Sequence, residues 1–258
     1  MDTVVQHDVF DAHFHIVDLR FPLVANNGYL PGPFTAGDYL ARVGALNVTG
    51  GAVVSGSFQA FDQSYLKEAL AQLGSSFVGV TQLPAEVSDA QILDLDEAGV
   101  RAVRFNLYRG GSAALADVDT LGRRVHEVAG WHSEFYLDAA DLGELEPILA
   151  ALPQISIDHL GMSDDDSGAL LGLAEAGAVV KATGFGRMSV SDPESLMRNI
   201  IRANPASLVF GSDLPSTRAA TPFQDSDIDR VADAVGPENA GAVLNGNARR
   251  LYRLTAGE

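Results

Sequence analysis

Short apolar runs alternate with longer segments of helical periodicity along most of the chain. The apolar runs predict strands at residues 10–15, 51–55, 77–81, 100–105, 134–137, 155–159, 178–181 and 208–213. The periodic segments predict helices at residues 37–46, 62–73, 88–98, 113–129, 142–152, 169–176, 192–203, 227–235 and 238–254. Thr35, Ser88 and Asp192 precede three of these segments and suit the capping position of a helix.

Eight strands alternating with helices predict a parallel sheet with right-handed crossovers, and eight is the number that closes a barrel. The length of 258 residues suits such a barrel. No linker or low-complexity tract divides the chain. We therefore expect an α/β fold, a (β/α)8 TIM barrel with a single domain over residues 1–258. An open doubly wound sheet is the alternative, but no glycine-rich nucleotide motif follows any strand.

Composition restricts the partners. The chain has 17 basic and 34 acidic residues and a formal charge of -17, so we expect neither nucleic acid nor a membrane as partner. A few arginines inside a pocket could still bind a small anion. Cysteine is absent, which excludes disulfides and a cysteine nucleophile. Residues 1–7 lack the pattern of a signal peptide, and we expect a cytoplasmic protein.

The first predicted strand contains the motif D-x-H-x-H, formed by Asp11, His13 and His15. Because alternate residues of a strand share a face, we expect these three on one side and the apolar residues between them on the other. Imidazole binds metals and also donates to carbonyl oxygens, so the histidines could hold a cation or bind an oxygen. Alternatively, they are polar residues satisfied where the strand meets its loop.

Two further candidates lie at the ends of other predicted strands, where barrel enzymes place their catalytic residues. His159 ends the sixth strand and Asp213 ends the eighth. Closure of strand eight onto strand one brings Asp213 beside His13 and His15. There, Asp213 could act as a general base for water, as a metal ligand or as the acceptor that orients an imidazole.

Arginines near strand ends indicate an anionic substrate. Arg104, Arg109 and Arg187 follow the fourth and seventh strands, and a guanidinium offers a planar fork of donors to a carboxylate. In the alternative, Arg104 pairs with a neighbouring carboxylate such as Asp138. The glycines at 110 and 111 would allow the loop after Arg109 to bend over a pocket.

Six short motifs together resemble the amidohydrolase superfamily, and within it the amidohydrolase 2 group that includes pyrone dicarboxylate lactonase and sugar lactonases. They are Asp11-Ala12-His13-Phe14-His15, Val103-Arg104-Phe105-Asn106, Asp158-His159-Leu160-Gly161, Lys181-Ala182-Thr183-Gly184, Gly211-Ser212-Asp213-Leu214-Pro215 and Asn247-Ala248-Arg249-Arg250-Leu251-Tyr252. The resemblance covers nearly the whole chain. After the aspartate the group commonly reads Trp-Pro-His, whereas this chain has Leu214-Pro215-Ser216 and lacks that histidine.

The resemblance implies a hydrolase in which a strand-eight aspartate activates water and histidines polarise the carbonyl. The residues it assigns to catalysis are Asp213, His13, His15 and His159. Hydroxyl groups around the substrate carboxylates would come from Ser55, Ser57, Tyr29 and Tyr136. The substrate would be a small anionic lactone.

The resemblance also bears on metal binding. Binuclear superfamily members carry a carbamylated lysine at the end of strand four, where this chain has Arg104 and Asn106. Its only lysines are Lys67 and Lys181. The lactonases of the group generally work without a metal, whereas related decarboxylases bind one zinc. We therefore expect either no required cofactor or one divalent cation, with zinc favoured. Its ligands would be His13, His15, His159 and Asp213.

We expect a hydrolase that opens a small carboxylated lactone, such as a pyrone dicarboxylate, a muconolactone or a sugar-acid lactone. A mononuclear zinc-dependent decarboxylase and a lactone isomerase are the catalytic alternatives. A barrel that only binds anions would need the arginines but not Asp213 and the three histidines.

Overall fold

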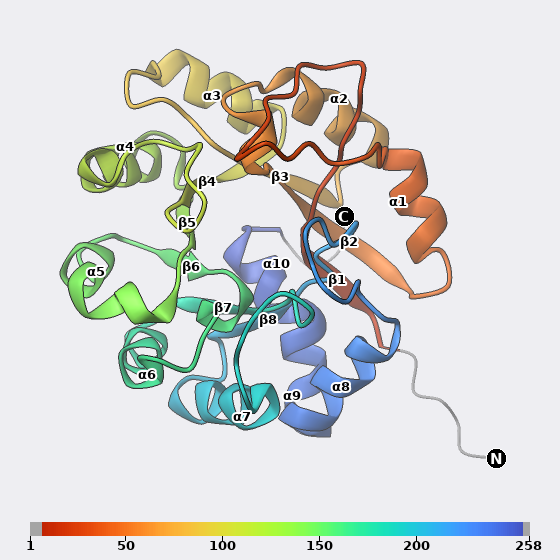
Figure 1. Ribbon diagram of the computed structural model, residues 1–258, viewed down its shortest axis with the longest axis vertical. Coiled ribbons are helices and arrows are strands. Elements are labelled where there is room, and N and C mark those ends of the chain that lie inside the picture. Colours follow the sequence, from red (N-terminus) through yellow and green to blue (C-terminus); the bar gives the residue numbers. More distant parts are fainter. Residues whose placement is uncertain (1–6, 255–258) are drawn as a thin grey trace.

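The computed structural model describes residues 7–254, and its framework is one sheet of eight parallel strands. Each strand pairs with the next along the chain. The strands are β1 (Val9–Phe14), β2 (Val48–Val54), β3 (Phe77–Thr81), β4 (Val100–Asn106), β5 (His132–Tyr136), β6 (Ile155–Ile157), β7 (Val179–Ala182) and β8 (Leu208–Phe210). The strands surround the centre of the molecule and the helices that alternate with them lie outside (Figure 1). The predicted (β/α)8 barrel is confirmed.

The outer helices follow the predicted segments closely. They are α1 (Ala36–Val43), α2 (Ser64–Leu73), α3 (Asp89–Glu97), α4 (Val118–Ala129), α5 (Leu142–Leu149), α6 (Ser167–Glu175), α7 (Pro193–Ala203) and α8 (Ser226–Val235). Thr35, Ser88 and Asp192 cap α1, α3 and α7 through side-chain acceptors, as predicted. No helix within residues 7–254 has the length and apolar character needed to cross a membrane.

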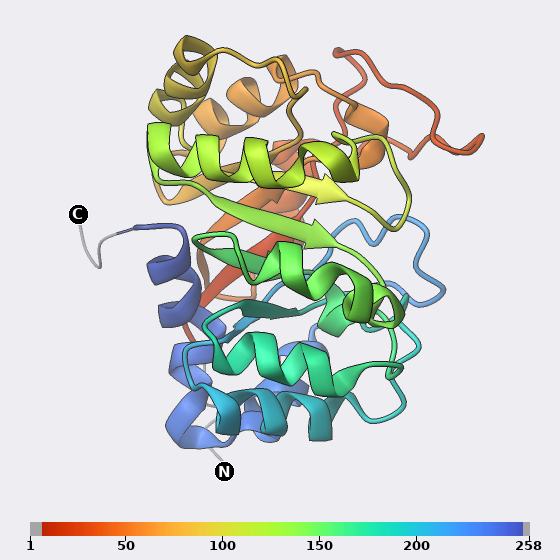
Figure 2. The same cartoon turned by 90° about the vertical axis from the view of Figure 1, so that its left-hand side faces the viewer.

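The final predicted helix is divided into three parts. The chain forms α9 (Pro237–Gly241), the π-helical segment η5 (Ala242–Gly246) and α10 (Asn247–Leu251) where the sequence predicted one helix over residues 238–254. Figure 2 shows α10 at the amino-terminal ends of the strands, opposite the loops that follow them. Leu251 and the adjacent Tyr252 pack into an apolar cluster with strand residues. This segment therefore closes the lower end of the barrel.

The barrel interior has an apolar lower part and a charged upper part. Below, the ring of Tyr252 stacks on that of Phe10, and both belong to an apolar cluster with other strand residues such as Val78. Above, toward the carboxyl ends of the strands, the buried residues include charged groups on β4, β5 and β7. A second, larger apolar cluster fills the space between the strands and the outer helices. The substrate site can therefore form only above the charged part.

His132 is buried in the lower part of the barrel interior, at the start of β5. It is 1% exposed, its ring lies 5.3 Å from that of Tyr252, and neither nitrogen has a hydrogen-bond partner among residues 7–254. Burial lowers the pKa of His132 to about 3. At mildly acidic pH, His132 is therefore protonated in the unfolded chain and neutral in the folded chain. Below pH 6.5, this group alone should reduce the free energy of unfolding by about 1.4 kcal/mol per pH unit.

We expect His132→Leu to lose that contribution. Urea unfolding at a series of pH values from 7 to 5 measures it, because the stability of the variant should fall less steeply than that of the wild type. Equal slopes for the two proteins would contradict the assignment of a neutral buried imidazole.

A β-bulge in β1 changes which residues face the barrel interior. The register between β1 and β2 shifts between Asp11 and Phe14, so strict alternation is lost there. Asp11 accepts hydrogen bonds from the hydroxyl of Tyr39 in α1 (3.0 Å) and from the backbone N–H of Ser212 (2.8 Å). The expectation that Asp11 shares a face with His13 and His15 is therefore wrong. Asp11 faces outward and ties β1 to α1 and to the end of β8.

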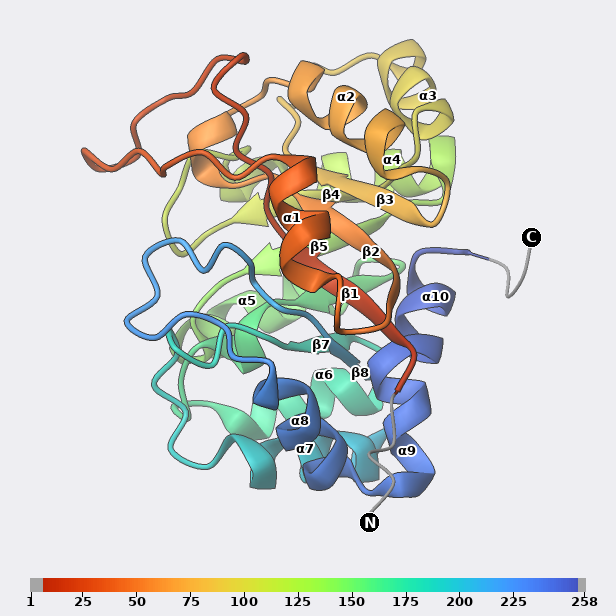
Figure 3. The same cartoon turned by 90° about the vertical axis from the view of Figure 1, so that its right-hand side faces the viewer.

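The barrel closes between β8 and β1 at the predicted site. The N–H of Asp213 donates to the carbonyl of His13, and the N–H of His15 donates to the carbonyl of Leu214, both at 2.7 Å. A Cβ at Gly211 would lie 2.8 Å from the His13 nitrogen, so glycine allows this close approach. Figure 3 shows the loops around residues 20–30 and 211–225 on the side opposite α10, above the carboxyl ends of the strands.

Candidate active site

An ionic layer crosses the upper barrel interior beneath the predicted site. Lys181 of β7 donates to Glu134 of β5 and also lies 3.6 Å from an oxygen of Asp158, which follows β6. Arg104 of β4 donates to Asp158 at 2.7 Å and approaches Glu134 at 3.4 Å. These four side chains are almost completely buried. Two cations and two carboxylates therefore balance one another inside the barrel.

The pKa values of the two buried carboxylates are shifted in different directions. Burial and the charge of Asp158 raise the pKa of Glu134 to about 7. Burial opposes the ionisation of Asp158, but the charges of Arg104 and Lys181 hold its pKa well below the usual range. Asp138, the alternative partner for Arg104, instead accepts from Ser163 and from the N–H of Ala140.

Asp213 lies directly above the ionic layer and is held by Arg187. Two nitrogens of Arg187 lie 2.6 and 2.7 Å from Oδ2 of Asp213, and Arg187 also donates to the carbonyl of Thr217. Burial would raise the pKa of Asp213, but the charge of Arg187 outweighs it and holds the pKa below its usual value. Asp213 therefore remains a carboxylate, with one oxygen bound to Arg187 and the other, Oδ1, free.

The free oxygen faces the two histidines of β1. Oδ1 of Asp213 lies 3.5 Å from Nε2 of His15 and 3.9 Å from Nε2 of His13. Nδ1 of His15 lies 2.7 Å from the carbonyl of Val54, an acceptor, so in the neutral ring Nδ1 carries the proton and Nε2 the lone pair. Two acceptors, Nε2 of His15 and Oδ1 of Asp213, thus face each other. A water molecule or a cation between them would satisfy both.

His159 and Tyr136 bring unpaired donors to the same region. Burial lowers the pKa of His159 to about 3, so its imidazole is neutral and carries one N–H. Neither its nitrogens nor the hydroxyl of Tyr136 has a hydrogen-bond partner among residues 7–254. The two rings are in edge contact, with centroids 5.0 Å apart. Both groups are available to a ligand.

A small, open pocket lies above these residues. The predicted residues that line it are His15, Ser57, Arg104, Arg109, Tyr136 and Arg187. Ser55 is turned away, because its hydroxyl lies 2.6 Å from that of Tyr65. Tyr29 does not line the pocket. Its ring lies under the guanidinium of Arg218, whose Cζ is 4.3 Å from the ring centroid.

The predicted metal ligands divide into two overlapping groups. His13, His15 and Asp213 form one group. His13 and His159 form the other together with Asp158, which was not among the predicted ligands. Unpartnered atoms such as Nε2 of His13 and Oδ1 of Asp213 fit a cation. The charges of the site argue against a cation. Arg187 already neutralises Asp213, and Arg104 and Lys181 neutralise Asp158. A divalent cation would therefore leave excess positive charge in a buried site.

The sequence predictions missed two charged residues. Glu134 was predicted only as a strand residue. It shares a strand face with Tyr136, and a charged residue on that face indicates a buried ion pair rather than an apolar core position. Arg218 was overlooked because it lies beyond the eighth-strand motif, yet it lines the pocket. Its position five residues after Asp213, in the same loop, was the available signal.

Comparison with known proteins extends this description. The amidohydrolase family model matches residues 10–254. A 2-pyrone-4,6-dicarboxylate hydrolase from Comamonas testosteroni is 31% identical over 61% of this chain, and the match spans only 53% of that relative's length. A 4-sulfomuconolactone hydrolase from Rhizobium radiobacter is 28% identical, with 94% of this chain and 89% of the relative covered.

Solved structures show the same fold. A probable 2-pyrone-4,6-dicarboxylic acid hydrolase from Acinetobacter baumannii superposes with a TM-score of 0.81 at 22% identity, covering 95% of this chain and 99% of that one. A structure from Agrobacterium tumefaciens gives a TM-score of 0.83 at 19% identity, with 97% of each chain covered.

Proposed function

This chain belongs to the amidohydrolase family, and from that premise we propose that it is a hydrolase that opens a small lactone carrying acidic groups. The two relatives named above support this choice, since their names describe a dicarboxylated and a sulfonated cyclic ester as substrates. The pocket supports it too, because four arginines line its wall.

The observation that carries the proposal is the pair of acceptors formed by Oδ1 of Asp213 and Nε2 of His15, which lie 3.5 Å apart. His15 also lines the pocket. A water molecule held there donates one hydrogen to each acceptor and presents its oxygen lone pair to the substrate. Asp213 takes the proton as that oxygen attacks the lactone carbonyl. The depressed pKa of Asp213 keeps it ionised over the neutral range.

The neutral donors stabilise the charge that develops on the carbonyl oxygen. The N–H of His159 and the hydroxyl of Tyr136 are unpaired within residues 7–254 and lie on the same side of the site. Donors held in place before the reaction contribute about 3 kcal/mol each to lowering the barrier. When the carbon–oxygen bond of the ring breaks, the protonated Asp213 returns its proton to the leaving oxygen. The product is the open-chain acid.

We propose that this reaction needs no metal, because both carboxylates of the candidate ligand groups are already neutralised. If a zinc ion were bound, His13, His15 and Asp213 would hold it, and it would polarise the carbonyl as a Lewis acid.

Chelation tests the metal assignment and the function together. Protein dialysed against a strong chelator is mixed with carboxylated pyrones, muconolactones and sugar-acid lactones, and proton release is followed. We expect at least one lactone to be opened at the rate of the untreated protein. Activity that disappears on chelation and returns with zinc would refute metal independence. No hydrolysis across the panel, with or without zinc, would refute the lactonase.

A further inference from the structure

Four arginines line the pocket, and they differ in how their charge is balanced. Arg104 and Arg187 are paired with Asp158 and Asp213. No ion pair within residues 7–254 includes Arg109 or Arg218. In a chain of net charge -17, two pocket guanidinium groups without a carboxylate partner are unexpected. They remain available to an anionic ligand.

Arg218 is held in a defined position although it lies on a loop. Its Nη2 donates to the backbone carbonyl of Asn26 at 2.5 Å and to the side-chain Oδ1 of the same residue at 3.2 Å. Its guanidinium covers the ring of Tyr29 at 4.3 Å. These contacts use one nitrogen and one face of the group, so its other N–H donors remain free.

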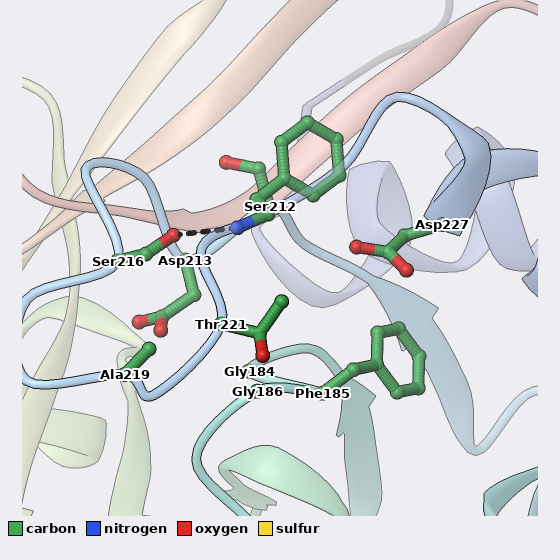
Figure 4. Close-up of a pocket in the computed structure, with 10 residues that line it drawn as sticks. Gly184, Phe185, Gly186, Ser212, Asp213, Ser216, Ala219, Thr221 and Asp227 are labelled. Carbon is green, nitrogen blue, oxygen red and sulfur yellow. Dashed lines mark hydrogen bonds between the residues drawn. The ribbon is translucent and has the colours of Figure 1, made fainter.

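The loop that carries Arg218 has a fixed base. The Phe223 N–H donates to the hydroxyl of Ser216 at 2.9 Å and joins the two ends of this loop. Figure 4 draws this hydrogen bond as a dashed line from Ser216. The N–H of Ala220 donates to the carbonyl of Gly186 in the loop after β7. A Cβ at Gly186 would lie 1.8 Å from the carbonyl oxygen of Thr221, so the two loops are in direct backbone contact.

Asn26 connects Arg218 to Arg109. Its Nδ2 donates to the backbone carbonyl of Arg109 at 3.2 Å, while its two oxygens accept from Arg218. The N–H of Arg109 is held in turn by Oδ1 of Asn106 at 2.9 Å. One asparagine therefore joins the loops after β1, β4 and β8, and holds the Arg218 guanidinium and the Arg109 backbone in one hydrogen-bonded group.

We propose that Arg109 and Arg218 form an anion clamp at the pocket mouth, and that Arg218 determines specificity by binding an acidic group of the substrate away from the reacting carbonyl. This inference rests on the proposed function for the identity of the substrate. Carboxylate and sulfonate groups both suit the donor fork of a guanidinium. Asn26 acts as a positioning residue for both arginines.

Binding of isophthalate, a ring with two carboxylates that contains no lactone to open, tests the clamp without turnover. By calorimetry, Arg218→Gln should weaken its binding about 10- to 100-fold, the effect expected for a lost charge-assisted contact. The neutral amide isophthalamide has nearly the same shape and should bind both proteins equally. Arg202→Gln removes the same charge from the exposed face of α7 and should bind isophthalate as the wild type does.

Kinetics then separate a clamp from a general disturbance of the pocket. With a dicarboxylated lactone, Arg218→Gln and Asn26→Ala should raise KM and leave kcat nearly unchanged. Asn26→Gln, which can restore part of the amide bridge, should recover part of the loss. A fall in kcat at constant KM, or isophthalate binding unchanged in Arg218→Gln, would overturn the clamp. If isophthalate binding depends on Arg218 but no lactone is opened, the clamp stands and the proposed function fails.

Discussion

Asp213→Asn is expected to reduce kcat for lactone opening by a factor of about 10²–10⁴, the usual contribution of a positioned general base. The amide has nearly the shape of the carboxylate but cannot accept the proton of the attacking water. Binding should survive, because the substitution also releases Arg187, whose guanidinium is then free to attract an anionic ligand. Steady-state kinetics measure kcat, and calorimetry with isophthalate measures binding.

The matched control for this change is Asp119→Asn. Asp119 lies on the exposed face of α4, where it pairs with Arg123, and its substitution changes the net charge by the same amount. Its kcat should equal that of the wild type. An Asp213→Asn protein that retained full activity would remove Asp213 from the mechanism.

Lys181→Met should destabilise the fold by about 3–5 kcal/mol, the cost of removing one partner from a buried ion pair. Lys181 is 0% exposed and donates to Glu134 and to the carbonyl of Ala12. Without it, Glu134 keeps only Arg104, at 3.4 Å, as a positive neighbour. Unfolding by guanidinium chloride, followed by circular dichroism, measures the loss.

The chain supplies its own comparison, since it contains only one other lysine. Lys67 pairs with Asp94 on the surface at 2.8 Å, and Lys67→Met should cost less than about 1 kcal/mol. The double variant Lys181→Met/Glu134→Gln removes the uncompensated charge and should be more stable than Lys181→Met alone. If Lys181→Met and Lys67→Met were equally stable, Lys181 would not contribute to the stability of the fold through the ionic layer.

The sequence allowed the barrel and the centre of the site to be predicted because both depend on periodic signals. Alternating apolar runs and helical segments revealed all eight units. His13, His15 and Asp213 followed from their positions at strand ends, and the hydrogen bonds between β8 and β1 bring them together as expected. Closure of the barrel is a geometric consequence of strand number, so this part needed no knowledge of side-chain contacts.

Other parts could not be read from the sequence because they depend on local departures from regular structure. A bulge turned Asp11 outward, and strict alternation cannot reveal a bulge. Arg104 was expected to bind substrate, with pairing to a neighbouring carboxylate such as Asp138 as the alternative. The carboxylate it pairs with is Asp158, a partner set by the order of strands around the barrel. The clamp joins three loops that are far apart along the chain, and no periodic pattern connects such segments.

The seam between β8 and β1 also determines when the site can appear during synthesis. Its two sides come from residues 13–15 and 213–214, almost two hundred positions apart along the chain. A ribosome must add almost two hundred residues after His15 before Asp213 can meet it. The nascent chain can assemble most of its strands without acquiring the site. Catalytic competence is therefore gained late, when the last strand joins the first.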